Sequence, residues 1–350
     1  MIKEKISNKD ATSFIRDLPK VELHLHLEGA IPIPAMLELC KKYGANVTET
    51  ELHDRFQFSD FNHFIQTWYW KNQFIKEYDD FEYIASAVAE DLSNQNIKYA
   101  EVYFSPADVG KSGLEPQPIA EAIRSGLNKH ISNITINLIA DLVRDFGAKK
   151  GEIILDKIAE VRNQGIVGIG IGGSEHEFPA KLFKKVYQKA RNFGFKTTTH
   201  AGEVAGSDSI WQAIKDLETD RIGHGTTAKN DAELVDYLIN NQIPVEMCPI
   251  SNVRTKVIND LSEHPIIDFY RRGMIVSVNT DDPKMFNTTL EKEYTSLVDT
   301  FNLGLIDIYN LAQNSIKSAW CSENSKNELN TELTKYYEKH VNLSQVIEKN

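Results

Sequence analysis

The sequence predicts an α/β fold, namely a TIM (β/α)8 barrel with an extended helical insertion after the first strand and extra C-terminal helices. Two observations support this prediction. Apolar, strand-like runs alternate with amphipathic stretches, which is the pattern of a parallel sheet built from βα units. Eight such runs are present, and eight strands close a barrel of this kind. They span residues 21–27, 98–105, 134–142, 166–172, 195–200, 221–224, 243–248 and 274–280.

The first strand shows how the barrel places polar groups. Leu23, Leu25 and Leu27 alternate with His24 and His26. Successive side chains of a strand point to opposite faces, so the leucines share one face and the histidines the other. The leucine face is expected to pack on the surrounding helices. Two imidazoles on the inner face, two positions apart, are then placed to chelate one ion.

The chain between the first two strands is long and predicts the helical insertion. It contains an aromatic segment, residues 56–74, which is expected to form helical core for the most part. An alternative for part of this segment is a lid over the barrel mouth. The chain after about Asn302 is expected to be helical as well.

The later connections carry helix signals. Amphipathic stretches span Lys181–Arg191, Ser209–Leu217, Asp231–Asn240 and His264–Arg272. Ser207 or Asp208 is expected to begin one of these helices, and Asn230 another. Gly194 and Gly273 follow two of the stretches and predict helix ends.

Composition narrows the class of protein. The formal net charge is -11 at pH 7, and no block of five basic residues is present. Nucleic acid and anionic membrane are therefore not expected as partners. The cysteines Cys40, Cys248 and Cys321 are far apart and form no Cys-x-x-Cys pair, which favours buried thiols in a reducing, cytoplasmic compartment. We expect residues 1–350 to form a single metal-dependent barrel domain.

Polar residues that suit a metal lie at the ends of several strands. His200 follows three threonines, and Glu203 lies three positions beyond it. Asp281 and Asp282 follow the last strand; alone, an Asp before Pro is as typical of a turn or a helix N-cap. Three imidazoles and one carboxylate without a thiolate suit Zn²⁺, with Fe²⁺, Co²⁺ or Mn²⁺ as substitutes. The end of the fourth strand has no lysine to bridge a second metal, which favours one zinc ion per chain.

Together these segments resemble the adenosine deaminase family of metal-dependent barrel hydrolases. The resemblance runs nearly the full length of the chain. The matching segments are residues 22–29, 103–106, 200–203, 221–225, 248–252 and 279–283.

The resemblance also implies a set of functional residues. It implies Zn²⁺ held by His24, His26, His200 and Asp281. It casts Glu203 as the acid that protonates the purine ring nitrogen N1, and His224 and Asp282 as the groups that position the attacking hydroxide and handle its proton. His26, Glu28, Gly173 and Asp282 are implied to contact substrate, with Glu28 at a sugar-contacting position and the Gly173 backbone bonding the purine.

The chemistry of purine deamination agrees with these roles. Attack of water on C6 breaks the aromaticity of the ring, so N1 must be protonated as the nucleophile adds. Glu203 must then arrive neutral, which requires a pKa raised by burial. Asp282 must stay ionised beside the metal, whose charge would lower its pKa.

Several substrates fit the sequence. We expect adenosine or 2′-deoxyadenosine, followed by another 6-aminopurine nucleoside such as 6-aminodeoxyfutalosine, and then free adenine. More distant alternatives are a mononuclear amidohydrolase acting on a non-purine ring and a non-catalytic barrel. The cytidine-type deaminases are excluded because their His-x-Glu and Pro-Cys-x-x-Cys elements are absent. Ser105, Ser251 and His176 are further candidates for contact with the substrate.

Overall fold

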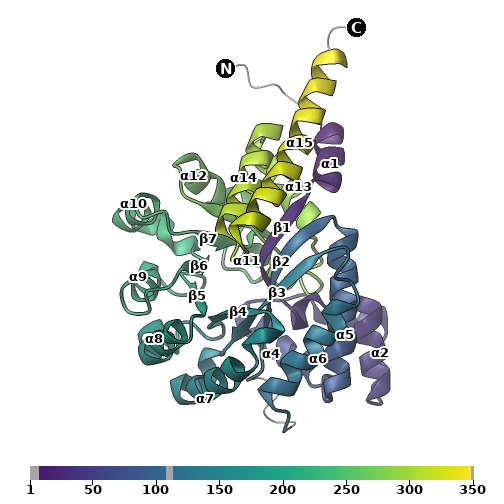
Figure 1. Ribbon diagram of the computed structural model, residues 1–350, viewed down its shortest axis with the longest axis vertical. Helices are drawn as coiled ribbons and strands as arrows, with labels where there is room; N and C mark the ends of the chain where they lie inside the picture. Colours follow the sequence, from purple (N-terminus) through teal and green to yellow (C-terminus); the bar gives the residue numbers. More distant parts are fainter. Residues whose placement is uncertain (1–7, 108–112, 348–350) are drawn as a thin grey trace.

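The eight strands form one parallel sheet in the order of the chain, as the sequence predicted (Figure 1). The computed structural model describes residues 8–107 and 113–347. The strands are β1 Lys20–His26, β2 Ile97–Phe104, β3 Thr135–Asp141, β4 Ile166–Gly170, β5 Lys196–Ala201, β6 Arg221–His224, β7 Val245–Met247 and β8 Val276–Val278. Each strand pairs in parallel with the next along the chain, and helices surround the sheet. The architecture is therefore a TIM barrel.

The barrel closes between β1 and the segment that follows β8, through a single residue, Asp281, that lies beyond the end of β8. A parallel bridge joins Leu25 to Asp281. The backbone N–H of Asp281 donates to the carbonyl of His24 at 2.9 Å, and the N–H of His26 donates to the carbonyl of Asp281 at 2.9 Å. The residue that completes the ring of strands is thus one of the four predicted metal ligands.

The alternation predicted for β1 is present. Leu23, Leu25 and Leu27 are fully buried members of the hydrophobic core. The ring of His24 lies 4.5 Å from that of His200 on the far side of the barrel interior. The histidines therefore face inward, as the period of two requires.

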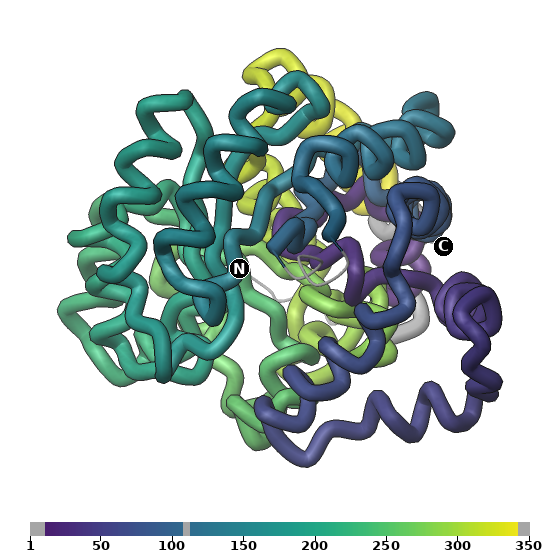
Figure 2. Tube along the Cα trace, turned by 90° about the horizontal axis from the view of Figure 1, so that it is seen from below, coloured from purple at the N-terminus to yellow at the C-terminus, as the bar shows by residue number. Residues whose placement is uncertain are grey.

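Helices surround the strands and extend the barrel at two points. Their bounds are α1 Asn8–Asp17, α2 Ile33–Lys42, α3 Glu49–Arg55, α4 Phe61–Asn72, α5 Tyr78–Asn94, α6 Pro116–Asn128, α7 Gly147–Glu160, α8 Lys184–Asn192, α9 Ser207–Lys215, α10 Ala232–Asn240, α11 Pro249–Arg254, α12 Ile266–Arg271, α13 Leu290–Phe301, α14 Leu305–Ser318 and α15 Glu323–Ile347. Helices α2 to α5 form the insertion after β1, and α13 to α15 follow β8. In Figure 2 the insertion, drawn in purple and blue, runs along one side of the molecule. Both predicted additions to the barrel are confirmed.

Most of the predicted helix limits hold, and one is wrong. Gly194 and Gly273 follow α8 and α12 with φ of 80° and 90°, the left-handed geometry that ends helices. The N-cap of α10 is Asp231 rather than Asn230, because the Asp231 carboxylate accepts the N–H of Leu234 at 3.0 Å. Either residue type caps helices well, so composition alone does not separate two adjacent candidates.

The last two strands are shorter than predicted. Beyond β7 the chain turns at Cys248 into α11, and beyond β8 it bends into the site at Asp281, where φ is 64°. Cys40 and Cys248 are buried as expected, whereas Cys321 is only half-buried. Among the described residues, no helix combines the length and apolar character that a membrane span requires.

Candidate metal and catalytic site

The four predicted metal ligands meet at the carboxyl ends of the strands. The Nε2 atom of His200 lies 3.1 Å from that of His24 and 3.3 Å from that of His26. The Oδ1 atom of Asp281 lies 3.5 Å from His24 Nε2 and 3.3 Å from His26 Nε2. Donor atoms about 2.0–2.1 Å from a tetrahedral zinc ion lie about 3.3–3.4 Å apart, so these spacings fit such an ion. The buried His/Asp cluster therefore has the donor set and spacing of a metal site.

His24 is oriented by a carboxylate that the sequence analysis missed. Its Nδ1 lies 2.8 Å from Glu246 Oε2, on β7. An ionised carboxylate only accepts, so Nδ1 carries the proton and Nε2 offers its lone pair to the cluster. Burial opposes ionisation of Glu246, but the charge of Arg221, 2.5 Å away, together with the contacts from His24 and Tyr103, outweighs burial and lowers the pKa of Glu246 to about 2. A glutamate inside an apolar strand was the available signal.

Asp281 is held in an ionised form by its surroundings. Burial alone would raise its pKa, but the neighbouring His24 and His26 imidazoles and other nearby groups together outweigh burial, and the pKa lies well below its ordinary value. Its second oxygen, Oδ2, accepts the hydroxyl of Ser251 at 2.6 Å. Ser251 thus contacts a predicted metal ligand and does not line the pocket.

Glu203 lies in the loop after β5. The buried carboxylate of Glu175 holds this loop in place. The Glu175 side chain accepts four consecutive backbone N–H groups, those of residues 202–205, at 2.6, 3.1, 2.9 and 3.0 Å. Burial first, and then the charges of Asp281 and Glu175, raise the pKa of Glu203 well above its ordinary value. The raised pKa favours the neutral form of Glu203, which is the form that a proton donor needs.

His224 faces Glu203 from the end of β6. Its Nε2 lies 3.7 Å from Glu203 Oε2 and 4.0 Å from Asp281 Oδ2. Its φ of 62° is in the left-handed region, which is uncommon for a residue with a side chain and is typical of functional sites. Burial lowers the pKa of His224 to about 3, so the ring is neutral.

Asp282 presents its carboxyl beside the same cluster. Burial, and then the charge of Asp281, raise the pKa of Asp282 to about 8 when only protein groups act on it. A divalent cation close by would lower that pKa, because it favours the charged form. Gly29 packs so closely against this carboxyl that a Cβ at position 29 would occupy the same space.

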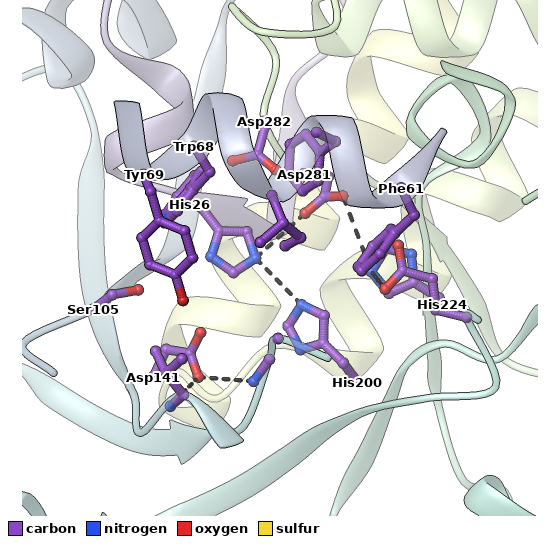
Figure 3. A pocket seen from close by; sticks show the side chains of 16 residues that line it. His26, Phe61, Trp68, Tyr69, Ser105, Asp141, His200, His224, Asp281 and Asp282 are labelled. Carbon is purple, nitrogen blue, oxygen red and sulfur yellow. Dashed lines mark hydrogen bonds and ion pairs between the residues drawn. The ribbon is translucent and has the colours of Figure 1, made fainter. Parts of the chain in front are cut away.

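These groups open into one pocket at the barrel mouth (Figure 3). Its lining includes His26, Ser105, Asp141, Gly173, His200, Glu203, His224, Asp281 and Asp282. Residues of α4 complete the wall: Phe61, Phe64, Ile65, Trp68 and Tyr69. In Figure 3 the helix that carries Trp68 and Tyr69 crosses the cluster. Helix α4 therefore covers the mouth of the barrel, which agrees with the alternative that part of residues 56–74 forms a lid. Phe56 and Phe74, in the same segment, are core residues.

Comparison with known proteins identifies the family. The adenosine deaminase family model matches residues 19–336, which is most of the chain. The chain belongs to the adenosine deaminase family.

The names of relatives within the family give three different activities. The chain is 31% identical to an aminodeoxyfutalosine deaminase of Streptomyces avermitilis, with 94% of each protein covered. It is 33% identical to an adenine deaminase of Wolinella succinogenes, covering 89% of this chain and 96% of that protein. It is 31% identical to an adenosine deaminase of Clostridium acetobutylicum, covering 93% and 97%.

Solved structures agree with this assignment. An amidohydrolase from Burkholderia ambifaria with bound Zn superimposes with a TM-score of 0.88 at 26% identity, covering 97% of this chain and 95% of that one. An adenine deaminase from Arthrobacter aurescens also gives 0.88, at 27% identity, covering 92% and 99%. The protein is a hydrolase of the adenosine deaminase type, which acts on the C–N bond of a cyclic amidine.

The substrate-binding residues that the family resemblance implied are distributed unevenly. His26, Gly173 and Asp282 line the pocket, and Gly173 has a φ of 100°. Glu28 is buried behind the pocket wall, where its Oε1 accepts the N–H of Ser105 at 3.0 Å. His176 lies outside the lining with its side chain 47% exposed, beside Glu177.

Asp141 is a pocket residue that the sequence analysis missed. Its Oδ1 accepts the backbone N–H groups of Gly172 at 2.8 Å and Val143 at 3.1 Å. These two bonds fix the carboxylate at the end of β3, with its side chain in the pocket wall (Figure 3). An aspartate at the end of a predicted strand was the available signal.

Proposed function

We propose that this protein catalyses the zinc-dependent hydrolytic deamination of a 6-aminopurine nucleoside. Adenosine and 2′-deoxyadenosine are the preferred substrates, giving inosine or 2′-deoxyinosine and ammonia. The observation that carries this proposal is the convergence, in one pocket, of a buried carboxyl with a raised pKa (Glu203), a buried imidazole (His224) and a set of candidate metal donors.

We propose that His24, His26, His200 and Asp281 hold one zinc ion, with the close approach of their donor atoms, 3.1 Å between His24 and His200 and 3.3 Å between His26 and Asp281, as support. Bound there, zinc supplies Lewis acidity and makes hydroxide available near neutral pH. Glu246 contributes by keeping the Nε2 lone pair of His24 directed at the cluster.

The remaining groups perform the proton transfers. Glu203 donates its proton to N1 as the oxygen of water adds to C6, so the ring gains no net negative charge. His224 and Asp282 flank the attacking oxygen; His224 positions it, and one of its protons passes through Asp282 to the exocyclic nitrogen. The C6–N bond then breaks and ammonia leaves. N1 keeps the proton from Glu203. The second proton of the added water leaves the C6 oxygen and, directly or through solvent, restores the proton of Glu203 for the next cycle.

The pocket favours an uncharged substrate. Among the described residues that line it, no lysine or arginine is present, whereas Asp141, Glu203, Asp281 and Asp282 all carry carboxyl groups. The phosphate of a nucleotide would lack a cationic partner there, and Asp141 would repel it. A carboxylate oxygen in the wall suits a ribose hydroxyl or a ring N–H instead. Free adenine and 6-aminodeoxyfutalosine are the alternatives, supported by relatives of similar identity.

A substrate panel tests the proposal. Protein loaded with one equivalent of Zn²⁺ would be assayed for ammonia release from adenosine, 2′-deoxyadenosine, adenine, AMP and 6-aminodeoxyfutalosine. We expect the highest kcat/KM with adenosine or 2′-deoxyadenosine and the lowest with AMP. Turnover of adenine alone would contradict the nucleoside assignment, and inertness towards every aminopurine would contradict the proposed reaction.

A further inference from the structure

A chain of buried polar side chains runs from His224 away from the pocket. His224 Nδ1 lies 3.1 Å from the side-chain nitrogen Nδ2 of Asn252, on α11. The Asn252 oxygen Oδ1 lies 3.1 Å from Nε2 of His264, which precedes α12. All three side chains are buried, at 1%, 0% and 3% exposure, so water does not compete for these contacts.

The direction of every hydrogen bond in this chain is fixed by a backbone group at its far end. The N–H of Ile266, which can only donate, points at His264 Nδ1 at 3.3 Å. His264 Nδ1 must therefore accept, and the proton of this neutral ring lies on Nε2. His264 Nε2–H then donates to the Asn252 oxygen. The Asn252 amide presents its NH₂ to His224, whose Nδ1 must accept in turn.

We propose that Asn252 and His264 are positioning residues that hold His224 as the tautomer with its proton on Nε2. The geometry supports the catalytic side of this assignment, because Nε2 is the atom that faces Glu203 and Asp281. A protonated Nε2 donates to the attacking oxygen and has no lone pair to accept its proton. The acceptor for that proton is then Asp282. This last step rests on the proposed deaminase function, whereas the tautomer itself does not.

The tautomer can be measured without turnover. In ¹⁵N-histidine-labelled protein, with and without zinc, the His224 signals are those that disappear in His224→Gln. We expect an unprotonated Nδ1 and a protonated Nε2 in both forms. A protonated Nδ1 in the wild-type protein would overturn the proposal, whatever substrate the enzyme uses and even if a variant fails to fold.

The substitution Asn252→Asp should reverse the direction of the hydrogen bond to His224, with little change in the size of the side chain. A carboxylate accepts from both neighbours, so it should draw a proton onto His224 Nδ1. If Nδ1 stays unprotonated in this variant, Asn252 does not set the tautomer and the proposal fails.

Kinetics separates positioning from folding. General acid–base groups contribute about 10²–10⁴-fold to rate, so loss of the ordered tautomer in His264→Phe should lower kcat by about 10-fold or more. KM should change by less than about 3-fold and metal content should not change, because neither residue touches substrate or the metal donors. His264→Gln, which keeps an N–H donor, should recover much of the loss. Equal kcat in the His264→Phe and wild-type enzymes would overturn the catalytic role.

Discussion

The backbone of Asp281 is hydrogen bonded to that of His24, and the side chains of the same two residues face each other at 3.5 Å. One contact completes the ring of strands and the other belongs to the proposed metal donor cluster. The position of Asp281 is therefore set by main-chain hydrogen bonds of the barrel itself. The donors are preorganised by the fold, which lowers the conformational cost of binding.

The first prediction concerns Glu203. Glu203→Gln keeps the size of the side chain but removes the transferable proton. We expect kcat to fall by about 10³-fold or more, because protonation of N1 is lost. A general acid typically contributes about 10²–10⁴-fold to the rate. Zinc content, measured by atomic emission, should stay at one ion per chain. Turnover close to wild type in this variant would remove Glu203 from the mechanism.

The second prediction concerns the carboxylate behind His24. Glu246→Gln should weaken zinc affinity by about 10–100-fold, because a neutral amide orients and polarises the imidazole less than a carboxylate does. Competition with a chromophoric chelator would measure the change. The matched control is Glu101→Gln, since Glu101 also pairs with Arg221, at 2.6 Å, but is not a hydrogen-bond partner of His24. Equal losses in both variants would show that the Arg221 network, not the His24 contact, governs affinity.

The third prediction tests the close packing of Gly29 on Asp282. Gly29→Ala places a methyl group where the Asp282 carboxyl lies, so this carboxyl must move. We expect kcat to fall by about 10²-fold, with the fold and zinc content retained, as steady-state kinetics and circular dichroism would show. Gly206→Ala is the control, because a Cβ at that position meets no atom within 4 Å. An unaffected kcat in Gly29→Ala would argue that Asp282 has no role in the reaction.

The fourth prediction concerns pH and stability. Glu293 on α13 is fully buried, and burial raises its pKa well above the ordinary value of 4.5. In the unfolded chain this group ionises above about 4.5, whereas the folded protein keeps it protonated. Its contribution to stability is therefore full below pH 4.5 and is lost as pH rises towards the folded pKa.

Glu293→Gln should remove this loss. Urea denaturation at pH 5 and pH 9 should show a smaller fall in the free energy of unfolding for Glu293→Gln than for the wild type. Glu291→Gln, two residues earlier and only half-buried, should keep the wild-type fall. If Glu293→Gln and the wild type lose the same free energy between the two pH values, another group carries the dependence.

Features that depend on local pattern were predictable from the sequence. The two-residue alternation in β1 fixes which face His24 and His26 share, and apolar runs locate all eight strands. Because parallel strands end on one side of a barrel, residues at those ends converge. That rule predicts that His200 and Asp281 lie beside the first two histidines.

Features that depend on contacts between distant segments were not predictable. Glu246 meets His24 across the barrel, and Glu175 binds a loop 27 to 30 residues later in the chain. Nothing near either residue in the sequence marks its partner. The hydrogen bonds that link His264 to His224 through Asn252 were not predictable for the same reason. They form only when α11 packs against the loop before α12. Their geometry exists only in three dimensions.

The proposed metal donors come from three places in the chain: the first strand, the fifth strand, and Asp281, which lies beyond the end of the last strand. During synthesis on the ribosome, a chain that has emerged only as far as β7 therefore has three imidazoles and no aspartate to complete the set. The complete donor set forms only after most of the polypeptide has left the exit tunnel. Truncated translation products should consequently compete poorly with the finished protein for scarce metal in the cell.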